Sequence, residues 1–301
     1  MPHKNPAVAV VMSTYNGMPF VGKQIESVLG QEGVAVSLFV RDDGSTDGTA
    51  ELLQGLEDEG KLTLFGGKNL GVVKSFINLL GRVPAEFEWV ALCDQDDVWH
   101  ADKLSRAVAA LSQGGRSVPK LYCSEYTFCD EHMNQIGRSH LNHIGINFAT
   151  LLYETKVSGN TCVMNRRLCD IAADAGAKDV YGHDWWLGLI AAGLGELYFD
   201  DYQSLEYRRL STSVSPTGGS FFNVMRFRVR AYLRGNQLDQ IDGQLKRFYE
   251  LFGEKLDSEN KALIEKFIFG GRIAKAIAPV RLRQAVAEEI ALRLLFLIGK
   301  L

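Results

Sequence analysis

The sequence predicts an α/β fold built on a mostly parallel central sheet. Apolar, strand-like runs alternate with amphipathic helical patterns four times within about the first hundred residues, which is typical of βαβ units with right-handed crossovers. The polar clusters of this region follow its strands, so we expect them at the sheet edge where open α/β sheets bind ligands. No GxGxxG follows the first strand and no GxxxxGK[ST] occurs. The dinucleotide-binding and P-loop fingerprints are therefore absent.

Composition restricts the class of protein. A chain of 301 residues, 46% of them hydrophobic, can bury a large core in one or two domains. Its five cysteines include no CxxC pair, so neither a disulfide framework nor a cysteine zinc site is indicated, and we expect a reducing cytoplasm. The N-terminus lacks a signal-peptide pattern, and no window approaches 18 uninterrupted apolar residues. Secretion and membrane spanning are not expected.

The net charge of −3 is unevenly distributed. Residues 208–301 contain 17 Lys and Arg against 9 Asp and Glu, a balance of +8, which leaves −11 for residues 1–207. The acidic part contains the carboxylate clusters described below. We expect the basic part to face something anionic.

The first two strands should end in polar turns. Residues 7–12 form a continuous apolar run, as in a central parallel strand, and the turn at 13–17 precedes a helix over 19–30. A second strand over 36–40 ends at the acidic, glycine-rich turn 41–49. Such a turn can place a carboxylate against a ribose hydroxyl or a base N–H.

The fourth strand leads into the most acidic stretch. A third strand over 62–65 and a helix over 72–80 precede it, and the strand at 89–92 is followed by Asp94-Gln95-Asp96-Asp97. Three carboxylates this close are costly unless a cation shares them, and hard divalent ions take such ligands together with substrate phosphates. A solvated acidic turn is the alternative for so short a motif. The other polar turns at the same sheet edge favour the ligand site.

A second chemical centre follows further along the chain. A helix over 101–111 and strands over 121–128, 162–164 and 197–199 surround Tyr181-Gly182-His183-Asp184-Trp185-Trp186, which opens an apolar helix. An Asp at a helix entrance is commonly an N-cap, and this reading stands beside a catalytic one. The two tryptophans offer large flat faces for a ring-shaped ligand, with core packing as the alternative for one of them.

Four ordered motifs resemble the inverting family 2 glycosyltransferases with the GT-A fold, and more narrowly their bacterial rhamnosyltransferase-like members. They are Ser-Thr-Tyr-Asn-Gly (13–17), Asp-Asp-Gly-Ser-Thr-Asp-Gly-Thr (42–49), Asn-Leu-Gly (69–71) and Asp-Gln-Asp-Asp-Val-Trp (94–99). The likeness covers about residues 7–210. It implies a GT-A catalytic domain, a Rossmann-like sheet flanked by helices, over residues 1–220, followed by a helical C-terminal extension over residues 221–301.

The resemblance also implies residue roles. Asp43 contacts the nucleotide base, in a pocket that Tyr15 and Asn16 help to line. Of Asp94 and Asp96, which match the family's DxD, one reaches the ribose and Asp96 binds a divalent metal, Mg²⁺ or Mn²⁺, with Asp97 as the alternative ligand. Asp42 or Asp47 could instead cap the helix after its turn, a role we favour for Asp47. The other implied substrate contacts are Thr14, Asn69, Asn160, His183, Trp185, Arg208 and Arg209.

The general base implied by the resemblance is Asp184. It would accept the proton of an acceptor hydroxyl as that oxygen attacks the anomeric carbon opposite the leaving diphosphate. A base without an evident covalent nucleophile indicates single displacement with inversion. One carboxylate cluster cannot serve both the diphosphate and the acceptor.

The chain departs from the family pattern at Tyr207-Arg208-Arg209-Leu210, where relatives often show Tyr-Arg-x-His. If that histidine holds metal or diphosphate in relatives, its role must pass here to Arg208, Arg209 or a hydroxyl of Ser211 to Ser213. The stretch 211–220 is rich in Ser, Thr and Gly, and we expect it to be a lid over the nucleotide.

The C-terminal part reads as helical from Phe221 onward, with a last helix over 280–298. Arg226, Arg228, Arg230 and Arg234 lie ahead of these helices. One interpretation is an extension packed on the catalytic domain or a partner subunit. The other is a peripheral membrane contact, in which basic residues meet anionic lipid. That contact would suit a lipid-linked acceptor at the inner face of the cytoplasmic membrane.

The sequence therefore predicts a metal-dependent inverting glycosyltransferase of the cytoplasm. Its donor would be a nucleotide-diphosphate sugar, dTDP-rhamnose or a UDP-hexose, and its acceptor a glycan of bacterial cell-surface polysaccharide, O-antigen or capsule. A homo-oligomer fits the sequence, and no nucleic-acid partner is expected. A sugar-1-phosphate nucleotidyltransferase is an alternative, although the basic, glycine-rich triphosphate loop that it needs is missing after the first strand. A non-catalytic sugar-binding scaffold is another, against which intact Asp94, Asp96 and Asp184 argue.

Overall fold

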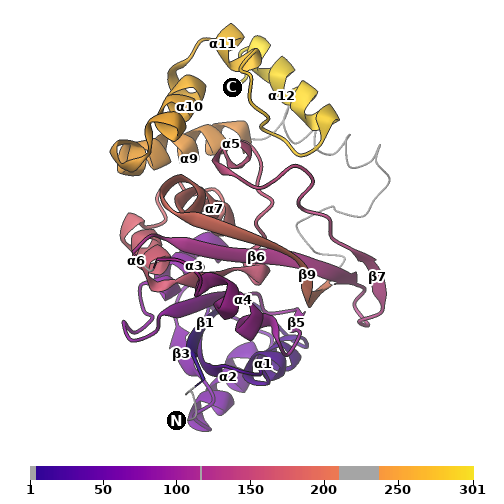
Figure 1. Ribbon diagram of the computed structural model, residues 1–301. Coiled ribbons are helices and arrows are strands. Elements are labelled where there is room, and N and C mark those ends of the chain that lie inside the picture. Colours follow the sequence, from indigo (N-terminus) through magenta and orange to yellow (C-terminus); the bar gives the residue numbers. More distant parts are fainter. Residues whose placement is uncertain (1–4, 116, 210–236) are drawn as a thin grey trace.

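The computed structural model describes residues 5–115, 117–209 and 237–301. Its centre is a curled mixed sheet whose strands follow the order β3-β2-β1-β4-β8-β6-β9-β5, with β7 paired to β6 (Figure 1). The strands are β1 (Ala7–Thr14), β2 (Ala35–Asp42), β3 (Thr63–Gly66), β4 (Trp89–Cys93), β5 (Val98–Trp99), β6 (Lys120–Cys129), β7 (Gln135–Arg138), β8 (Val163–Asn165) and β9 (Glu196–Arg208).

The parallel half of the sheet is the half that the sequence predicted. β3, β2, β1 and β4 all run in one direction, with Thr14 level with Asp42 and Met12 level with Cys93. The order of the strands reverses at β1, because β2 and β3 follow on one side of it and β4 lies on the other. Open α/β sheets bind ligands in the crevice at such a switch point.

The other half of the sheet is mixed. β8 runs antiparallel to β4 and β6, whereas β6 and β9 are parallel. The strand predicted at 197–199 continues to Arg208 as β9, with register shifts where it passes Ser124 and Glu125. β5 and β7 were not predicted, because β5 has only two residues and β7 is exposed along its whole length. Neither shows the apolar alternation by which strands are recognised.

Helices cover both faces of this sheet. They are α1 (Val21–Leu29), α2 (Thr49–Asp58), α3 (Val72–Leu80), α4 (Lys103–Leu111), α5 (Phe148–Leu151), α6 (Arg166–Ala175), α7 (His183–Leu194), α9 (Gln237–Phe252), α10 (Ser258–Phe269), α11 (Arg272–Ala276) and α12 (Val286–Leu297). The last helix begins at Val286 rather than at the predicted 280. The amides of Leu282 and Arg283 donate to the Glu289 carboxylate, which holds the preceding chain outside the helix.

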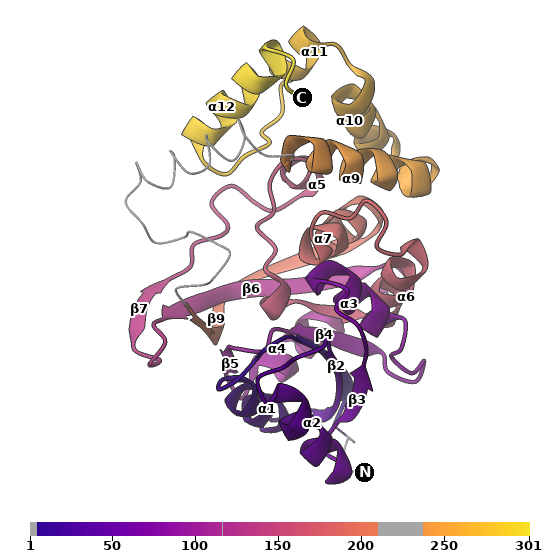
Figure 2. The same cartoon turned by 180° about the vertical axis from the view of Figure 1, so that it is seen from behind.

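Alternate residues of β1 enter two hydrophobic cores. Val8, Val10 and Met12 pack toward α1 and α4, and Ala9 and Val11 pack toward α3, α6 and α7. The second core continues through Phe248, Phe267 and Phe296 into α9, α10 and α12. Figures 1 and 2 show these C-terminal helices as a cap over α5 and α7, at the opposite end from α1 and α2. The helical extension therefore packs on the part of the chain that carries the sheet.

Candidate active site

The turns after β1 and β4 are joined by one side chain. The Gln95 amide donates from Nε2 to the Tyr15 carbonyl (3.1 Å) and accepts at Oε1 from the Tyr15 amide (2.9 Å). Gly17 lies against it, and an added Cβ there would lie 2.7 Å from Gln95 Oε1. The Tyr15 side chain is 51% exposed, so its ring is open to a ligand. The two turns thus form one wall at the switch point.

The turn after β2 is tied to the turn after β1. Asn16 has a left-handed φ of 49°. Its amide donates to Ser45 Oγ (2.8 Å), and its side-chain oxygen accepts from the Thr46 amide (2.9 Å). Asp42 accepts hydrogen bonds from Ser45 and from the buried Thr14 hydroxyl (3.2 Å). The polar residues predicted to meet at this sheet edge do so.

Asp43 has partners inside the protein for both carboxylate oxygens. Oδ2 accepts from the amides of Leu70 (2.8 Å) and Gly71 (2.9 Å), and Oδ1 forms an ion pair with Arg41. Asn69 also accepts from the Gly71 amide (2.9 Å), and its side chain is exposed. Asp43 thereby fastens the loop before α3 to the end of β2. Its contact with a nucleotide base stays a prediction.

Asp47 lies beside the start of α2 but does not occupy the capping position favoured for it from the sequence. Its Oδ1 accepts from the amide of Thr49, the first helical residue (3.1 Å), and its Oδ2 accepts from the Met18 amide (2.9 Å). The N-cap position itself is occupied by Gly48, which has no side chain to cap with. Asp47 therefore supports the helix from one residue further back.

The turn after β4 differs, because two of its carboxylates lack a hydrogen-bond donor from another described residue, although Asp96 accepts from its own amide. Among the described residues, none donates a side-chain or neighbouring backbone hydrogen bond to Asp94 or Asp96. Burial raises the pKa of Asp94 to about 7, and the charges of Asp96 and Asp184 add to this effect. Burial also raises the pKa of Asp96, against the opposing charge of Arg208. Asp94 thus lies next to two other carboxylates, and the Arg208 charge does not offset the effect of burial on Asp96.

Both carboxylate oxygens of Asp97 accept hydrogen bonds from other residues. It is fully buried, and its Oδ2 accepts from Asn160 Nδ2 (2.6 Å) while its Oδ1 accepts from the Arg208 amide (3.3 Å). The Asn160 side chain is itself buried, and its oxygen accepts from Ser158 Oγ (2.8 Å). Asn160 therefore positions Asp97, and its contact with substrate stays a prediction. The geometry favours Asp96 over Asp97 as a ligand for a cation.

Arg208 stands beside the acidic turn, where the family pattern continues toward its histidine. Its Nε donates to the Asp96 carbonyl (2.9 Å), its Nη1 donates to the Glu131 carbonyl (2.7 Å), and its guanidinium lies 4.5 Å from the centre of the Phe20 ring. Arg209 lies over the Phe128 ring at 4.9 Å. Leu210, the expected lid at 211–220 and the arginines at 226–234 lie outside the described residues.

Asp184 lies in the first turn of α7, where a carboxylate is stabilised by the helix dipole. The N-cap is Gly182, so the N-cap reading of Asp184 does not hold. Its Oδ1 accepts from the Trp185 amide (2.7 Å), and its charge raises the pKa of Asp94. The structure therefore brings the two predicted chemical centres, 90 residues apart in the sequence, into one electrostatic environment.

His183 lies behind this carboxylate. Its ring stacks on Phe76, with centroids 4.3 Å apart, and burial lowers its pKa. An added Cβ on Gly159 would lie 2.8 Å from His183 Nε2, so the close approach requires glycine. Within the described part of the chain, Nε2 has no hydrogen-bond partner. His183 is thus a neutral side chain that holds the start of α7 against α3.

The two tryptophans belong to the core, which corrects the expectation that Trp185 faces a sugar. Trp185 is 4% exposed, and its indole N–H donates to the Leu151 carbonyl (2.5 Å). Trp186 is fully buried against Phe248 and Phe252 of α9. The sequence could not show this, because the partners of both rings come from α5 and α9.

Comparison with known proteins identifies the family. A model described as glycosyl transferase family 2 matches residues 9–170, more than half of the chain. The chain belongs to glycosyl transferase family 2. This family 2 member is 31% identical over 109 residues to the dTDP-rhamnosyl transferase RfbG of Shigella flexneri, which is 33% of this chain and 36% of that one. It is 33% identical over 108 residues to the putative teichuronic acid biosynthesis glycosyltransferase TuaG of Bacillus subtilis (strain 168), 35% and 42% of the two chains.

The matched segments thus span well under half of these relatives. Solved structures extend the likeness at the level of the fold. Residues 1–349 of TarS from S. aureus, crystallised with UDP, superpose with a TM-score of 0.55 at 16% identity, over 97% of this chain and 87% of that one. The predicted fold, GT-A with C-terminal helices, is therefore confirmed.

The acidic turn after β4 fits a metal site that substrate oxygens complete, rather than one closed by protein ligands alone. No group of three His, Cys, Asp or Glu side chains in the described ranges forms a ligand cluster. Mg²⁺ is usually held by one or two carboxylates together with substrate phosphates, and Asp96 with the neighbouring Asp94 provides that kind of donor set. Burial raises the pKa of both carboxylates, and the charges of Asp96 and Asp184 raise that of Asp94 further; a bound cation would favour their ionised forms.

Lys103 is a feature of the site region that sequence reasoning missed. It is fully buried, and its Nζ lies 4.4 Å from the centre of the Trp99 ring without a hydrogen-bond partner among the described residues. Burial lowers its pKa to about 8, against the opposing influence of the Cys162 and Cys93 thiols and the Asp97 carboxylate. The sequence did indicate that Lys103 would be buried, because it shares the apolar face of α4 with Ala107 and Leu111.

Proposed function

We propose that this family 2 protein transfers a sugar from a nucleotide-diphosphate donor to a hydroxyl of a glycan acceptor with inversion. The observation that carries the proposal is the arrangement of carboxylates at the switch point. Asp94 and Asp96 lie together on one side without a hydrogen-bond donor from another described residue, and the charge of Asp184, from a separate helix, acts on Asp94. Two distinct acidic groups match the two tasks of glycosyl transfer, expulsion of a diphosphate and activation of an acceptor.

On the donor side, Asp96 would hold a divalent ion, Mg²⁺ or Mn²⁺, with Asp94 placed for the ribose. When bound, such an ion supplies Lewis acidity for the charge that grows on the leaving diphosphate. Arg208 lies against the Asp96 carbonyl and adds a fixed positive charge beside that charge. Tyr15 and Asn16, held by Gln95 and Ser45, would line the nucleotide pocket.

On the acceptor side, Asp184 would be the general base. The acceptor oxygen forms its bond to the anomeric carbon as the bond to the diphosphate oxygen breaks, the bonding pair leaves with the diphosphate, and the proton moves to the Asp184 carboxylate. Neutral His183 and the buried Trp185 fix the start of α7, so the carboxylate is held in place before the reaction.

The proposed substrates follow the names of similar proteins. RfbG is a dTDP-rhamnosyl transferase and TuaG is assigned to teichuronic acid biosynthesis, whereas TarS was crystallised with UDP and with UDP-GlcNAc. These names support a dTDP-rhamnose or UDP-hexose donor and an acceptor in bacterial cell-surface polysaccharide, O-antigen or capsule. We place the reaction in the cytoplasm.

We also propose a peripheral membrane contact through α11 and α12. No helix in the described ranges has the length and apolarity to cross a bilayer. Val286, Ile290, Leu294 and Leu297 nevertheless form an exposed apolar stripe along α12, with the exposed Arg272 and Lys300 at one end of it. This pattern suits the interface of an anionic membrane. Co-sedimentation with vesicles rich in phosphatidylglycerol should fall in Ile290→Glu/Leu294→Glu; binding that is equal in wild type and variant would contradict the contact.

Replacement of Asp184 tests the proposed base. Asp184→Asn should lower sugar transfer by about 10²- to 10⁴-fold, the range for loss of a general base. Donor binding, measured as thermal stabilisation by nucleotide-diphosphate sugar, should remain because Asp94 and Asp96 are untouched. Asp174→Asn, a carboxylate change on α6 away from the site, is the matched control. Retained turnover in Asp184→Asn would remove Asp184 from the role.

A further inference from the structure

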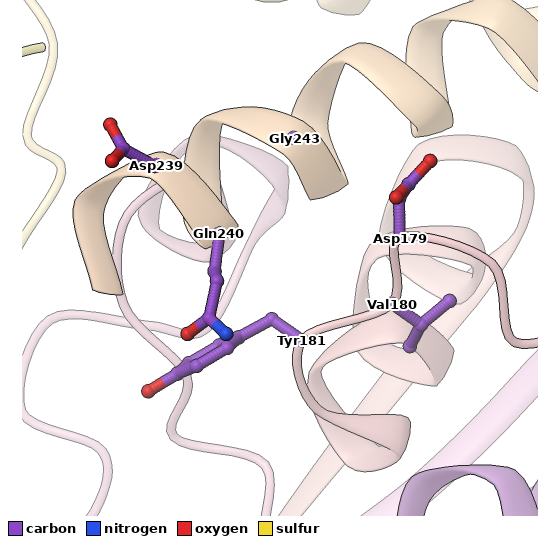
Figure 3. Close-up of a pocket in the computed structure, with 6 residues that line it drawn as sticks. All are labelled: Asp179, Val180, Tyr181, Asp239, Gln240 and Gly243. Atoms are coloured by element: carbon purple, nitrogen blue, oxygen red, sulfur yellow. The ribbon is translucent and has the colours of Figure 1, made fainter. Parts of the chain in front are cut away.

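A cavity of about 540 Å³ lies between the loop that leads into α7 and helix α9 (Figure 3). The described residues that line it are Asp179, Val180, Tyr181, Asp239, Gln240 and Gly243. Figure 3 shows the Gln240 side chain extending from α9 toward the Tyr181 ring, with Asp179 and Val180 on the other side. The cavity thus lies where the C-terminal helices meet the segment that carries Asp184.

The walls of this cavity are held together by side chains. The buried Gln244 accepts at Oε1 from the amides of Tyr181 (2.9 Å) and Gly182 (3.4 Å), and Gln237 donates to the Tyr181 hydroxyl (2.9 Å). The Tyr181 ring stands edge-on to Trp185, with centroids 5.9 Å apart. Gln244 Nε2 is buried and has no partner in the described part of the chain. The cavity is therefore pre-formed rather than a gap between mobile parts.

The cavity lies close to the proposed base. Tyr181 precedes Asp184 by three residues, so their Cα atoms are at most about 11 Å apart. Gly182, between them, lies so close to the base that an added Cβ would be 3.0 Å from Asp184 Oδ1. A ligand in the cavity that extends along this segment would reach the carboxylate.

The lining suits a carbohydrate. The carboxylates of Asp179 and Asp239 can accept from sugar hydroxyls, the Gln240 amide can both donate and accept, and Tyr181 adds aromatic surface to the wall. The described lining contains two carboxylates and neither Lys nor Arg. Like charge would oppose a uronic acid or a phosphorylated sugar here.

Gly243 provides the room. It lies inside α9, and a Cβ added to it would meet nothing within 4 Å. Glycine in a helix interior is less favourable than alanine, and no close backbone contact in the structure requires it at this position. The presence of glycine here is explained by the space that it leaves on the side of α9 that borders the cavity.

We propose that this cavity binds the acceptor glycan, at sugar units next to the reacting hydroxyl, and that it selects neutral or amino sugars over acidic ones. The proposal rests on the proposed function, since it assigns the acceptor side of the same reaction. It gives the C-terminal helices a part in substrate selection.

The test fills the cavity and leaves the donor site alone. Wild type, Gly243→Leu and the control Gly55→Leu are compared on an array of neutral and acidic bacterial-type oligosaccharides, each in the presence of UDP or dTDP and Mn²⁺. Gly55 also lies inside a helix, α2, with nothing within 4 Å of an added Cβ. We expect wild type and Gly55→Leu to bind neutral glycans, and Gly243→Leu to bind them at least tenfold more weakly with unchanged thermal stabilisation by the donor.

Three results would overturn the proposal: no neutral glycan bound by wild type, a preference for acidic glycans, or equal binding by Gly243→Leu and Gly55→Leu. Any of them with donor stabilisation intact would leave the proposed transferase standing. Loss of donor stabilisation in wild type would count against the transferase itself.

Discussion

Two acidic turns flank the first strand of the sheet, and they use their carboxylates in opposite ways. After β2, Asp43 and Asp47 are each met by backbone amides, and Asp43 is paired with Arg41 as well. After β4, Asp94 and Asp96 accept no hydrogen bond from another described residue, and burial raises the pKa of both. The first turn is complete without a ligand, whereas the second is electrostatically incomplete.

This difference separates residues that build the site from residues available to a ligand. A carboxylate whose oxygens accept from amides has its charge stabilised in the folded chain. Carboxylates that only repel each other gain most from a cation. We therefore assign the turn after β2 mainly to shaping the nucleotide side and the turn after β4 to binding the diphosphate through a metal.

The largest expected effect on stability is at Asp43. Asp43→Asn removes one charge of a buried ion pair and leaves Arg41 with Asp42 as its neighbouring carboxylate, which should lower the free energy of unfolding by about 3 kcal/mol. Urea denaturation followed by circular dichroism measures it, with Asp201→Asn, an exposed carboxylate, as the control. Unchanged stability together with loss of donor binding in Asp43→Asn would contradict the structural role assigned to the turn after β2. The predicted base contact would then be the main role of Asp43.

A smaller effect should appear in the pH dependence of stability. The pKa of Asp94 is about 7 in the folded chain, above its ordinary value near 4, so the folded state binds more protons between these pH values. Its contribution to stability is then full below about pH 4 and is lost as pH rises through 7. In metal-free buffer, Asp94→Asn should flatten the fall of Tm between pH 5 and 8 by a few degrees. An equal fall in variant and wild type would contradict this account of the turn after β4.

Much of the fold was predictable because its signals are local. β-branched apolar runs mark β1, β2 and β4, and the edge at which their turns meet follows from the parallel topology. The different roles of Asp43, whose oxygens have partners in the protein, and Asp96, which is available to a ligand, could not be predicted from the local sequence. Asp43 accepts from amides 27 and 28 residues away. Asp97 accepts from the Asn160 side chain, 63 residues away. The burial of Trp185 and the cavity beside Tyr181 likewise depend on α5 and α9, whose packing no short window shows.

Donor binding by the turn after β4 is tested most directly by thermal stabilisation of wild type and Asp96→Asn. Each is measured with a panel of UDP-, dTDP- and GDP-sugars, with and without Mn²⁺ or Mg²⁺. A ligand at a hundred times its Kd stabilises the native state by about 2.7 kcal/mol. We predict that at least one donor raises the Tm of wild type only when the metal is present, and that Asp96→Asn loses this increase. No stabilisation by any donor, or the same metal-dependent increase in Asp96→Asn, would contradict the account.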